Sequence, residues 1–451
     1  MAELAGSTRS LSMPAPSGVE RVNLLFFLSA FMFRIGLALV TFEQDRPFGI
    51  MLSDYCFFLS LLFFFSFPKY RMMKGTGLLT AGALILAGAL LSLLNDPNLN
   101  GAVVPLGKLF TLFGLFAPLA IVHAKNIHKN MVFLIVGIFV NCAVTLLQAW
   151  VFPGMVDALS INPQTLDQSE IQRFQGLTEF PVTLGLSAAL AVLIGAGLLL
   201  SERRKFARWG LAFLLVICTI AGLLSGSRTF LVALIPGLIV FALLQKNRRR
   251  TVVRALVAVA AVWVAITYFS PSAISQYAVR LDSVGFVDYA RLAVAAQGVM
   301  DISQKPILGW GINHFTETGL VFIPEINDFQ GAHVTLLQYW YGAGLLGAIG
   351  FLTLFIIPVR RMLRVLRERP SRFTNAVRLI FACYVSFFII FNLGPYLYNR
   401  FLYIPMFVFA GFAARLPLPV ETCVVARHGQ GRGHPASRFT RREAPINPDV
   451  L

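Results

Sequence analysis

Charged residues are scarce in this chain, and acidic residues are the scarcer kind. Only 13% of the 451 residues are charged, with 21 aspartates and glutamates against 38 lysines and arginines. The five cysteines form neither a disulfide framework nor a zinc site. The sequence contains no Gly-rich phosphate loop of the Walker type. These absences argue against a disulfide-stapled domain, a zinc protein and an ATPase.

Apolar residues dominate instead, at 57% of the chain with a mean hydropathy of +0.72. A stretch of about 17–25 apolar residues is long enough to cross a bilayer as a helix. We expect an all-α polytopic membrane protein with twelve such helices, at about residues 22–42, 48–67, 76–94, 103–122, 131–152, 181–200, 209–225, 229–244, 252–269, 333–358, 376–394 and 398–414. The boundary between the seventh and eighth is soft. The first twenty residues are polar and lack the apolar core of a cleavable signal peptide.

The basic residues predict the orientation of these helices. With both termini in the cytoplasm, 28 of the 38 lysines and arginines fall in inner loops and termini, and seven fall in outer segments. Such an excess on one side is the positive-inside pattern of inner-membrane proteins. The net charge of +17 is therefore a signal of topology, and it gives no support to nucleic-acid binding.

The chain divides accordingly into five parts. We expect a cytoplasmic N-terminus at 1–21, nine spans within 22–269 with an outer loop at 153–180, a large outer loop at 270–332, three spans within 333–414, and a disordered basic cytoplasmic tail at 415–451. Apolar residues at helical spacing within 289–302 predict an amphipathic helix on the outer leaflet. Proline and two glycines within 305–311 then predict a tight turn that returns the chain towards His333.

Three of the arginines expected on the outer side are candidates for a binding site: Arg173, Arg228 and Arg291. Charge at a membrane surface is costly unless function requires it. Guanidinium groups bind phosphate oxygens in two-point fashion, so several arginines that converge on one cavity would suit a diphosphate. The competing interpretations are that Arg228 extends to lipid phosphate and that Arg291 pairs with Asp288 on one helix face.

His333 opens the tenth predicted span. An imidazole with an ordinary pKa of about 6.5 is the natural general base near neutral pH. The competing interpretation is a rim residue without chemistry. His123, His128 and His314 are weaker candidates, the first two because they face the cytoplasm and the third because it follows the Gly turn.

Few other charges could contribute to a site. Lys108, towards the outer end of its span, could supplement a phosphate site, and Asp54 could neutralise Arg34 near mid-bilayer. A metal site is not expected. The one close pair of outer acids, Glu43 and Asp45, stands on a short loop without a histidine.

Four short motifs, in order, resemble those of the O-antigen ligase and polymerase superfamily of bacterial inner membranes. They are Arg173-Phe174-Gln175-Gly176, Ser227-Arg228-Thr229, Pro306-Ile307-Leu308-Gly309-Trp310-Gly311, and His333 followed by Gly344 and Gly347. The last matches a ligase pattern, except that Val334 stands where a polar residue is usual. The motifs cover roughly residues 170–350.

The resemblance implies transfer of a polysaccharide from undecaprenyl diphosphate to a sugar of lipid A–core, on the periplasmic face and without metal, ATP or other cofactor. It further implies that His333 is the general base and that Arg228 and Arg291 hold the diphosphate. Arg173 would assist them, with Lys108 and Arg400 as outlying candidates.

Three alternatives remain open. An O-antigen polymerase shares the topology and the lipid carrier, but its Arg-x10-Gly spacing is absent here, since eleven residues separate Arg173 from Gly185 and six separate Arg291 from Gly298. A ligase with a protein acceptor is a second alternative. An anion transporter is the third, and Pro236 in the eighth span would be one of its broken helices, although no paired counterpart is evident.

Overall fold

The structure is a computed structural model of the chain. It describes residues 58–59, 62, 77–96, 99–123, 127–151, 174, 176–178, 181–202, 204–245, 289–323, 328–331, 333–367, 374–394 and 396–416. The predicted spans at 22–42, 48–67 and 252–269 therefore lie wholly or almost wholly outside the described residues, as do Arg34, Asp54, Arg173 and the termini.

Nine of the predicted spans coincide with helical segments. These are α3 (Gly77–Ser92) with the short helix η2 (Leu93–Asn95); α4 (Leu99–Leu109), the π-helical turn η3 (Phe110–Phe116) and α5 (Ala117–His123); α6 (Ile127–Trp150); α8 (Pro181–Ser201); α9 (Lys205–Leu224); α10 (Arg228–Leu243); α14 (Thr335–Arg367); α15 (Thr374–Phe391); and α16 (Arg400–Arg415). Within the residues that the structure describes, six helices are long and apolar enough to cross a membrane, and α10, α15 and α16 are shorter apolar helices. The described chain is thus a multi-pass, mainly α-helical membrane protein.

The side chains that point away from the helix bundle include large apolar ones. Along α9, Phe206 is 92% exposed, Trp209 77% and Phe213 62%. A soluble monomer rarely leaves so large an apolar surface open. The same surface is expected of a helix that contacts lipid.

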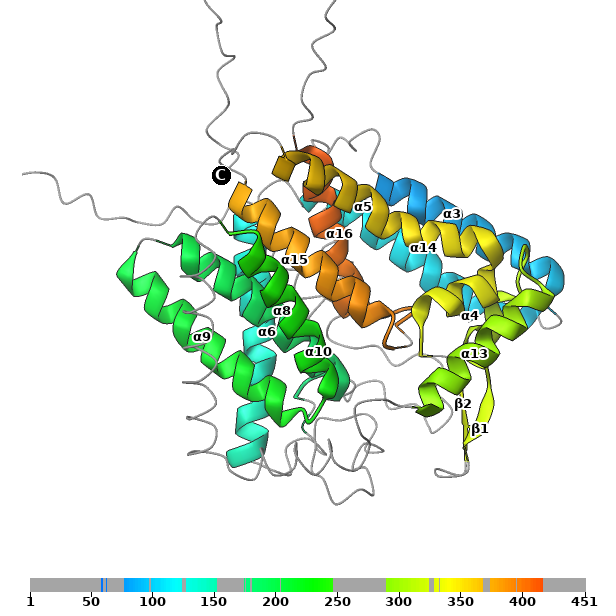
Figure 1. Ribbon diagram of the computed structural model, residues 1–451, viewed down its shortest axis with the longest axis horizontal. Helices are drawn as coiled ribbons and strands as arrows, with labels where there is room; N and C mark the ends of the chain where they lie inside the picture. The colour runs from blue at the N-terminus through cyan, green and yellow to red at the C-terminus, as the bar shows by residue number, and fades with distance from the viewer. Residues whose placement is uncertain are drawn as a thin grey trace, which may run out of the picture.

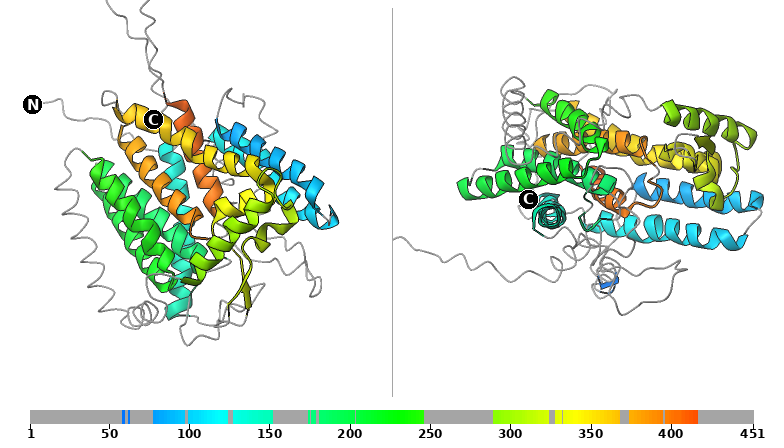
Figure 2. Two further views of the ribbon diagram at one scale, coloured as in Figure 1. Left: turned by 45° about the vertical axis from the view of Figure 1, so that its right-hand side comes forward. Right: turned by 90° about the horizontal axis from the view of Figure 1, so that it is seen from below.

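The helices form two groups, which Figure 1 shows on either side of α15 and α16. One contains α6, α8, α9 and α10. The other contains α3, α4, α5 and α14, and Figure 2 shows α3 and α4 at the far side of the molecule from α9. Helix α14 packs closely against α3, because Gly88 and Gly350 let the two backbones approach. A Cβ on either glycine would meet backbone of the other helix.

The segment before α14 is smaller and lies at one end of the second group (Figure 1). It consists of α13 (Tyr289–Gln304), the turn at 305–311, the 3₁₀ helix η5 (Ile312–Glu317), and an antiparallel hairpin of β1 (Val321–Ile323) and β2 (Asp328–Gln330). The helix predicted at 289–302 is confirmed. The hairpin was not predicted, so the expected all-α fold gains a short strand pair.

Helix α14 is broken at Gly344, where the backbone has φ 65° and ψ −163°. In an unbroken helix the N–H of Leu345 would donate to the carbonyl of Tyr341. Here the N–H of Leu345 donates to the carbonyl of Ile307 at 3.0 Å, and the carbonyl of Tyr341 accepts from the N–H of Trp310 at 2.7 Å. The turn at 305–311 therefore satisfies both groups that the break releases.

Glycine is required on both sides of this contact. Gly309 has φ 74°, and a Cβ there would meet the backbone of Tyr341 and Gly344. A Cβ on Gly344 would collide with the carbonyl oxygen of Ile307. Trp310 completes the contact, because its indole N–H donates to the carbonyl of Asp301 at 3.0 Å and its ring stacks on Tyr341.

The predicted span 103–122 coincides with one helical segment, Leu99–Ile121, which includes the π-helical turn η3. Two other sequence predictions are corrected. Pro236 lies inside the continuous helix α10 and does not break it. The tight turn docks into α14 at Gly344, well beyond His333, which itself lies two residues before the helix begins.

Candidate functional site

His333 lies at the entrance to α14, half-buried. Its Nδ1 is 2.9 Å from the carbonyl oxygen of Gly331. Because a carbonyl oxygen only accepts, this contact requires the proton on Nδ1. In the neutral ring Nε2 then carries the lone pair that can take up a proton. The backbone before α14 thus selects the tautomer that a general base needs.

The start of α14 is covered by the segment 392–399, which leads from α15 to α16. Thr335 Oγ donates to the carbonyl of Gly394 at 2.7 Å and accepts from the N–H of Tyr396 at 3.1 Å. One turn later, the hydroxyl of Tyr339 donates to the carbonyl of Leu397 at 3.0 Å. These bonds hold the segment that ends at Arg400 against the helix that follows His333.

A cluster of three aromatic rings, the aromatic junction, sets the position of α4 and η3 relative to α14 and α16. We use this name for Phe113, Tyr339 and Tyr403, one from η3, one from α14 and one from α16. The ring of Phe113 lies 6.4 Å from that of Tyr339 and 5.7 Å from that of Tyr403, and the two tyrosine hydroxyls are 2.9 Å apart. All three rings are buried, so the junction ties the three helices together.

The aromatic junction also places Lys108 beside Tyr398. Lys108 stands five residues before Phe113, and Tyr398 stands five residues before Tyr403, so the packing of Phe113 on Tyr403 brings the two earlier residues to a similar level. Its Nζ lies 5.5 Å from the centroid of the Tyr398 ring, within cation–π range, while the lysine side chain stays exposed. Lys108, His333 and the segment before Arg400 therefore share one end of the bundle.

Arg400 is the first residue of α16 and is half-buried. Its guanidinium carbon lies 6.0 Å from the centroid of the Phe401 ring. A guanidinium at a helix start adds a fixed positive charge to the one already expected from the helix dipole. Together with Lys108, it gives the His333 end of the bundle a positive character.

Arg228 is the first residue of α10 and is half-buried. Gly226, with φ 58°, makes the turn that separates α9 from α10. Helices α10 and α15 are antiparallel: Ser386 Oγ donates to the carbonyl of Ala233 at 2.8 Å. Arg228 stands five residues before Ala233, so at 1.5 Å per residue it lies level with the end of α15 at Phe391. Arg228 and Arg400 are thus at the same end of the bundle.

Arg173 lies outside the described residues, but its neighbours place the segment. The N–H of Phe174 donates to the carbonyl of Leu224 at 3.3 Å, at the end of α9. The N–H of Leu177 donates to Asn141 Oδ1 at 2.6 Å, and Gln148 Nε2 donates to the carbonyl of Gly176 at 3.2 Å. Phe174 therefore lies beside the end of α9, next to the turn that precedes Arg228, and Gly176 and Leu177 lie against α6.

Arg291 belongs to α13, and its side chain is outside what the structure describes. The backbone of α13 is well anchored. Asp301 accepts from Gln297 Nε2 at 2.8 Å and from the N–H of Gly319 at 3.0 Å. Leu292 and Val299 on α13 are 59% and 56% exposed, while Val294 and Ile302 are buried. Exposed apolar residues such as Leu292 and Val299 are what a contact between α13 and the outer leaflet would require. That contact stays a prediction.

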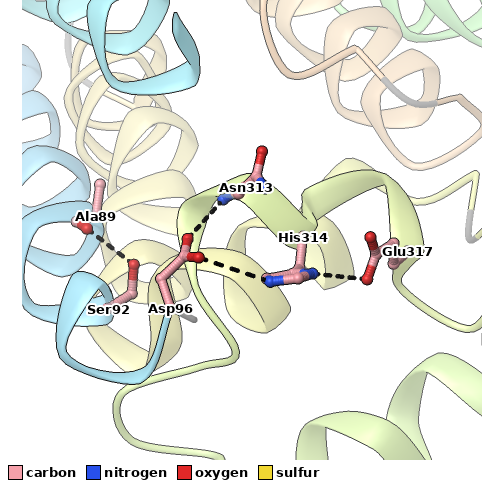
Figure 3. A network of polar contacts seen from close by, with 6 residues as sticks. All are labelled: Ala89, Ser92, Asp96, Asn313, His314 and Glu317. Atoms are coloured by element: carbon pink, nitrogen blue, oxygen red, sulfur yellow. Dashed lines mark hydrogen bonds and ion pairs between the residues drawn. The ribbon is translucent and has the colours of Figure 1, made fainter. Parts of the chain in front are cut away.

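Sequence reasoning missed a polar network at the same end, drawn in Figure 3. Asp96, whose side chain is fully buried, accepts from the N–H of Asn313 at 3.2 Å and lies 3.7 Å from His314 Nε2. His314 Nδ1 is 2.7 Å from Glu317 Oε2. Asn95 Nδ2 donates to the carbonyl of Gly309 at 2.9 Å. The end of α3 is thereby attached to η5 and to the turn that docks into α14.

No sequence signal could have found this network, because Asp96 and His314 are far apart in the chain. Its geometry assigns His314 a structural part, since one ring nitrogen faces a buried carboxylate and the other an exposed one. Within the described residues, no group of three or more histidines, cysteines and acids is placed to hold a metal.

Comparison with known proteins agrees with this arrangement. A family model described as O-Antigen ligase matches residues 211–352, a range that includes Arg228, Arg291, His333 and Gly344. No curated protein matches the chain. Over residues 211–352, the match confirms the resemblance to the O-antigen ligase and polymerase superfamily drawn from the motifs.

Proposed function

We propose that this protein is an O-antigen ligase of the bacterial inner membrane. It transfers a polysaccharide from undecaprenyl diphosphate to a sugar of lipid A–core on the periplasmic face. The observation that carries the proposal is that the segment before Arg400 is hydrogen-bonded to the start of α14, the helix that follows His333. Lys108, from a third part of the chain, contacts Tyr398 of that same segment. A base beside fixed positive charge is the arrangement that glycosyl transfer from a diphosphate requires.

In the proposed reaction His333 Nε2 takes the proton from the attacking hydroxyl of the acceptor sugar. The freed oxygen forms a bond to the anomeric carbon of the polysaccharide. The bond between that carbon and the diphosphate oxygen breaks, and undecaprenyl diphosphate leaves with the electron pair. General-base help of this kind typically contributes about 10²–10⁴ in rate. The donor brings its own leaving group, so the step consumes no ATP.

The arginines and Lys108 stabilise the negative charge that develops on the departing diphosphate. Arg228 and Arg291 are the proposed principal ligands, with Arg173, Lys108 and Arg400 around them. The support for Arg228, Lys108 and Arg400 is their shared end of the bundle, and the support for Arg173 is that Phe174, the next residue, lies at the end of α9 beside the turn before Arg228. Preorganised charge of this type is typically worth about 10²–10³ in rate for each group.

The test is the lipopolysaccharide pattern of a strain that lacks the gene, with and without a plasmid copy. The ligase proposal predicts core bands alone in the deletion strain, polymer accumulating on undecaprenyl diphosphate, and a restored ladder with the wild-type copy. Core plus a single repeat would mean a polymerase. An unchanged ladder would contradict both.

A further inference from the structure

Three of the buried polar atoms that have no hydrogen-bond partner among the residues that the structure describes belong to α14 and to the segment that covers its start. They are Gln338 Oε1, the hydroxyl of Tyr398 and Asn399 Oδ1. Gln338 is only 2% exposed. Nearly all buried polar groups in folded proteins are hydrogen-bonded, so each such atom calls for an explanation.

The three atoms belong to two segments that face each other. Thr335, Gln338 and Tyr339 stand at i, i+3 and i+4, hence on one face of α14. Thr335 and Tyr339 bond to Gly394 and Leu397 of the covering segment. Gln338 lies next to Thr335 on this face, on the side away from Tyr339, and we infer that it borders the same segment, which continues directly into Tyr398 and Asn399.

The chemistry of these atoms selects the ligand. Two are amide oxygens, which accept hydrogen bonds, and the third is a phenol hydroxyl, which donates or accepts. Burial raises the pKa of Tyr398 well above its ordinary value, so the hydroxyl stays neutral at working pH. Amide oxygens repel phosphate oxygens and bind groups that carry O–H. A sugar presents several O–H groups on one ring.

We propose that Gln338, Tyr398 and Asn399 form a hydroxyl subsite that binds the acceptor sugar and presents its attacking hydroxyl to His333. This inference rests on the proposed function. His333 stands five residues before Gln338, and Lys108 Nζ lies 5.5 Å from the centroid of the Tyr398 ring. In the proposed arrangement the subsite is bordered by the base and by a cation of the diphosphate site, where the two substrates must meet.

Two conservative variants test the subsite, Tyr398→Phe and Gln338→Met. Each removes an orphaned polar atom with little change in volume. The matched control is Tyr384→Phe, because Tyr384 is also buried but its hydroxyl donates to the carbonyl of Met406 at 3.1 Å. Purified protein is assayed with undecaprenyl diphosphate-linked polymer as donor and lipopolysaccharide from a strain without O-antigen as acceptor. KM is measured for each substrate separately, together with the melting temperature.

The inference predicts that both subsite variants raise the KM for the acceptor about tenfold, the effect of one lost hydrogen bond, with the donor KM unchanged. Their melting temperatures should equal or exceed the wild-type value, since the removed atoms have no partner. The control should lower the melting temperature and leave both KM values unchanged.

Three results would overturn it. A rise in donor KM alone would assign the subsite to the donor sugar. Unchanged KM values in both variants would mean that the atoms bind only water. If the wild-type protein transfers nothing to this acceptor, the proposed function fails, and the acceptor subsite fails with it. If the wild-type protein is active and the two variants are unaffected, only the subsite is overturned.

Discussion

The backbone N–H of Leu345 donates to the carbonyl of Ile307 at 3.0 Å, across the break in α14. The two residues belong to two different motifs, the Pro–Gly turn and the His333 helix. Each motif supplies a backbone group that the other needs, and glycine at 309 and 344 leaves room for the contact. The turn therefore completes the backbone hydrogen bonding of α14, the helix that follows His333.

Gly344→Ala should destabilise the protein by about 3 kcal/mol or more, because a Cβ at φ 65° is strained and collides with the carbonyl of Ile307. Thermal unfolding in detergent measures the effect. The control is Gly210→Ala on α9, where a Cβ meets nothing within 4 Å. Alanine there should be neutral or stabilising by up to about 1 kcal/mol. Equal melting temperatures for the two variants would show that the turn does not dock at the break.

Much of the fold was predictable from the sequence, because apolar runs such as 181–200 determine a membrane helix locally. The end of α14 was not, since its last turns contain Arg360, Arg364 and Arg367 and extend past the apolar stretch. Sequence motifs marked Gly344 as notable. Nothing local revealed that it breaks a helix, because the reason is the carbonyl of Ile307, 37 residues earlier.

The candidate site was predictable only in part, for the same physical reason. A histidine before an apolar span and an arginine after Gly-Ser are local signals, and they indicated His333 and Arg228. Gln338 and Asn399 become candidate site residues only once the structure shows that the segment before α16 covers the start of α14. The predictions for Arg173 and for the side chain of Arg291 stay predictions, since those groups lie outside the described residues.

Asp96→Ala should cost about 1–3 kcal/mol of stability, because it leaves the half-buried N–H of Asn313 without its acceptor and removes the carboxylate that lies 3.7 Å from His314 Nε2. Glu317→Ala should cost less than about 0.5 kcal/mol, since that carboxylate is 53% exposed. Chemical denaturation of the two variants compares the costs. A larger loss for Glu317→Ala would mean that the network is held by its exposed member.

Tyr398 should contribute to stability below pH 10 and lose that contribution at more alkaline pH. Burial raises its pKa in the folded protein above the unfolded value of about 10. The unfolded chain therefore ionises first as the pH rises, and the balance shifts towards unfolding. Melting temperatures of wild type and Tyr398→Phe between pH 8 and 11 test this. The variant should lose less stability with rising pH, and parallel curves would contradict the assigned burial.

Arg228→Ala should lower the transfer rate about 100- to 1,000-fold while the protein remains folded, because a fixed charge opposite the leaving diphosphate is lost. The measurement is initial rate with purified protein. Arg208→Ala serves as control, since Arg208 is exposed in the first turn of α9, at the opposite end of that helix from Arg228. Equal rates in the two variants would remove Arg228 from the diphosphate site.

The most direct test of the account is transfer by purified protein from undecaprenyl diphosphate-linked polymer to lipid A–core, in wild type, His333→Ala and His314→Ala. The account predicts that His333→Ala loses at least about 100-fold in rate with an unchanged melting temperature, while His314→Ala loses stability and keeps its rate per folded molecule. Full activity in folded His333→Ala, or loss confined to His314→Ala, would contradict the assignment of His333 as the base.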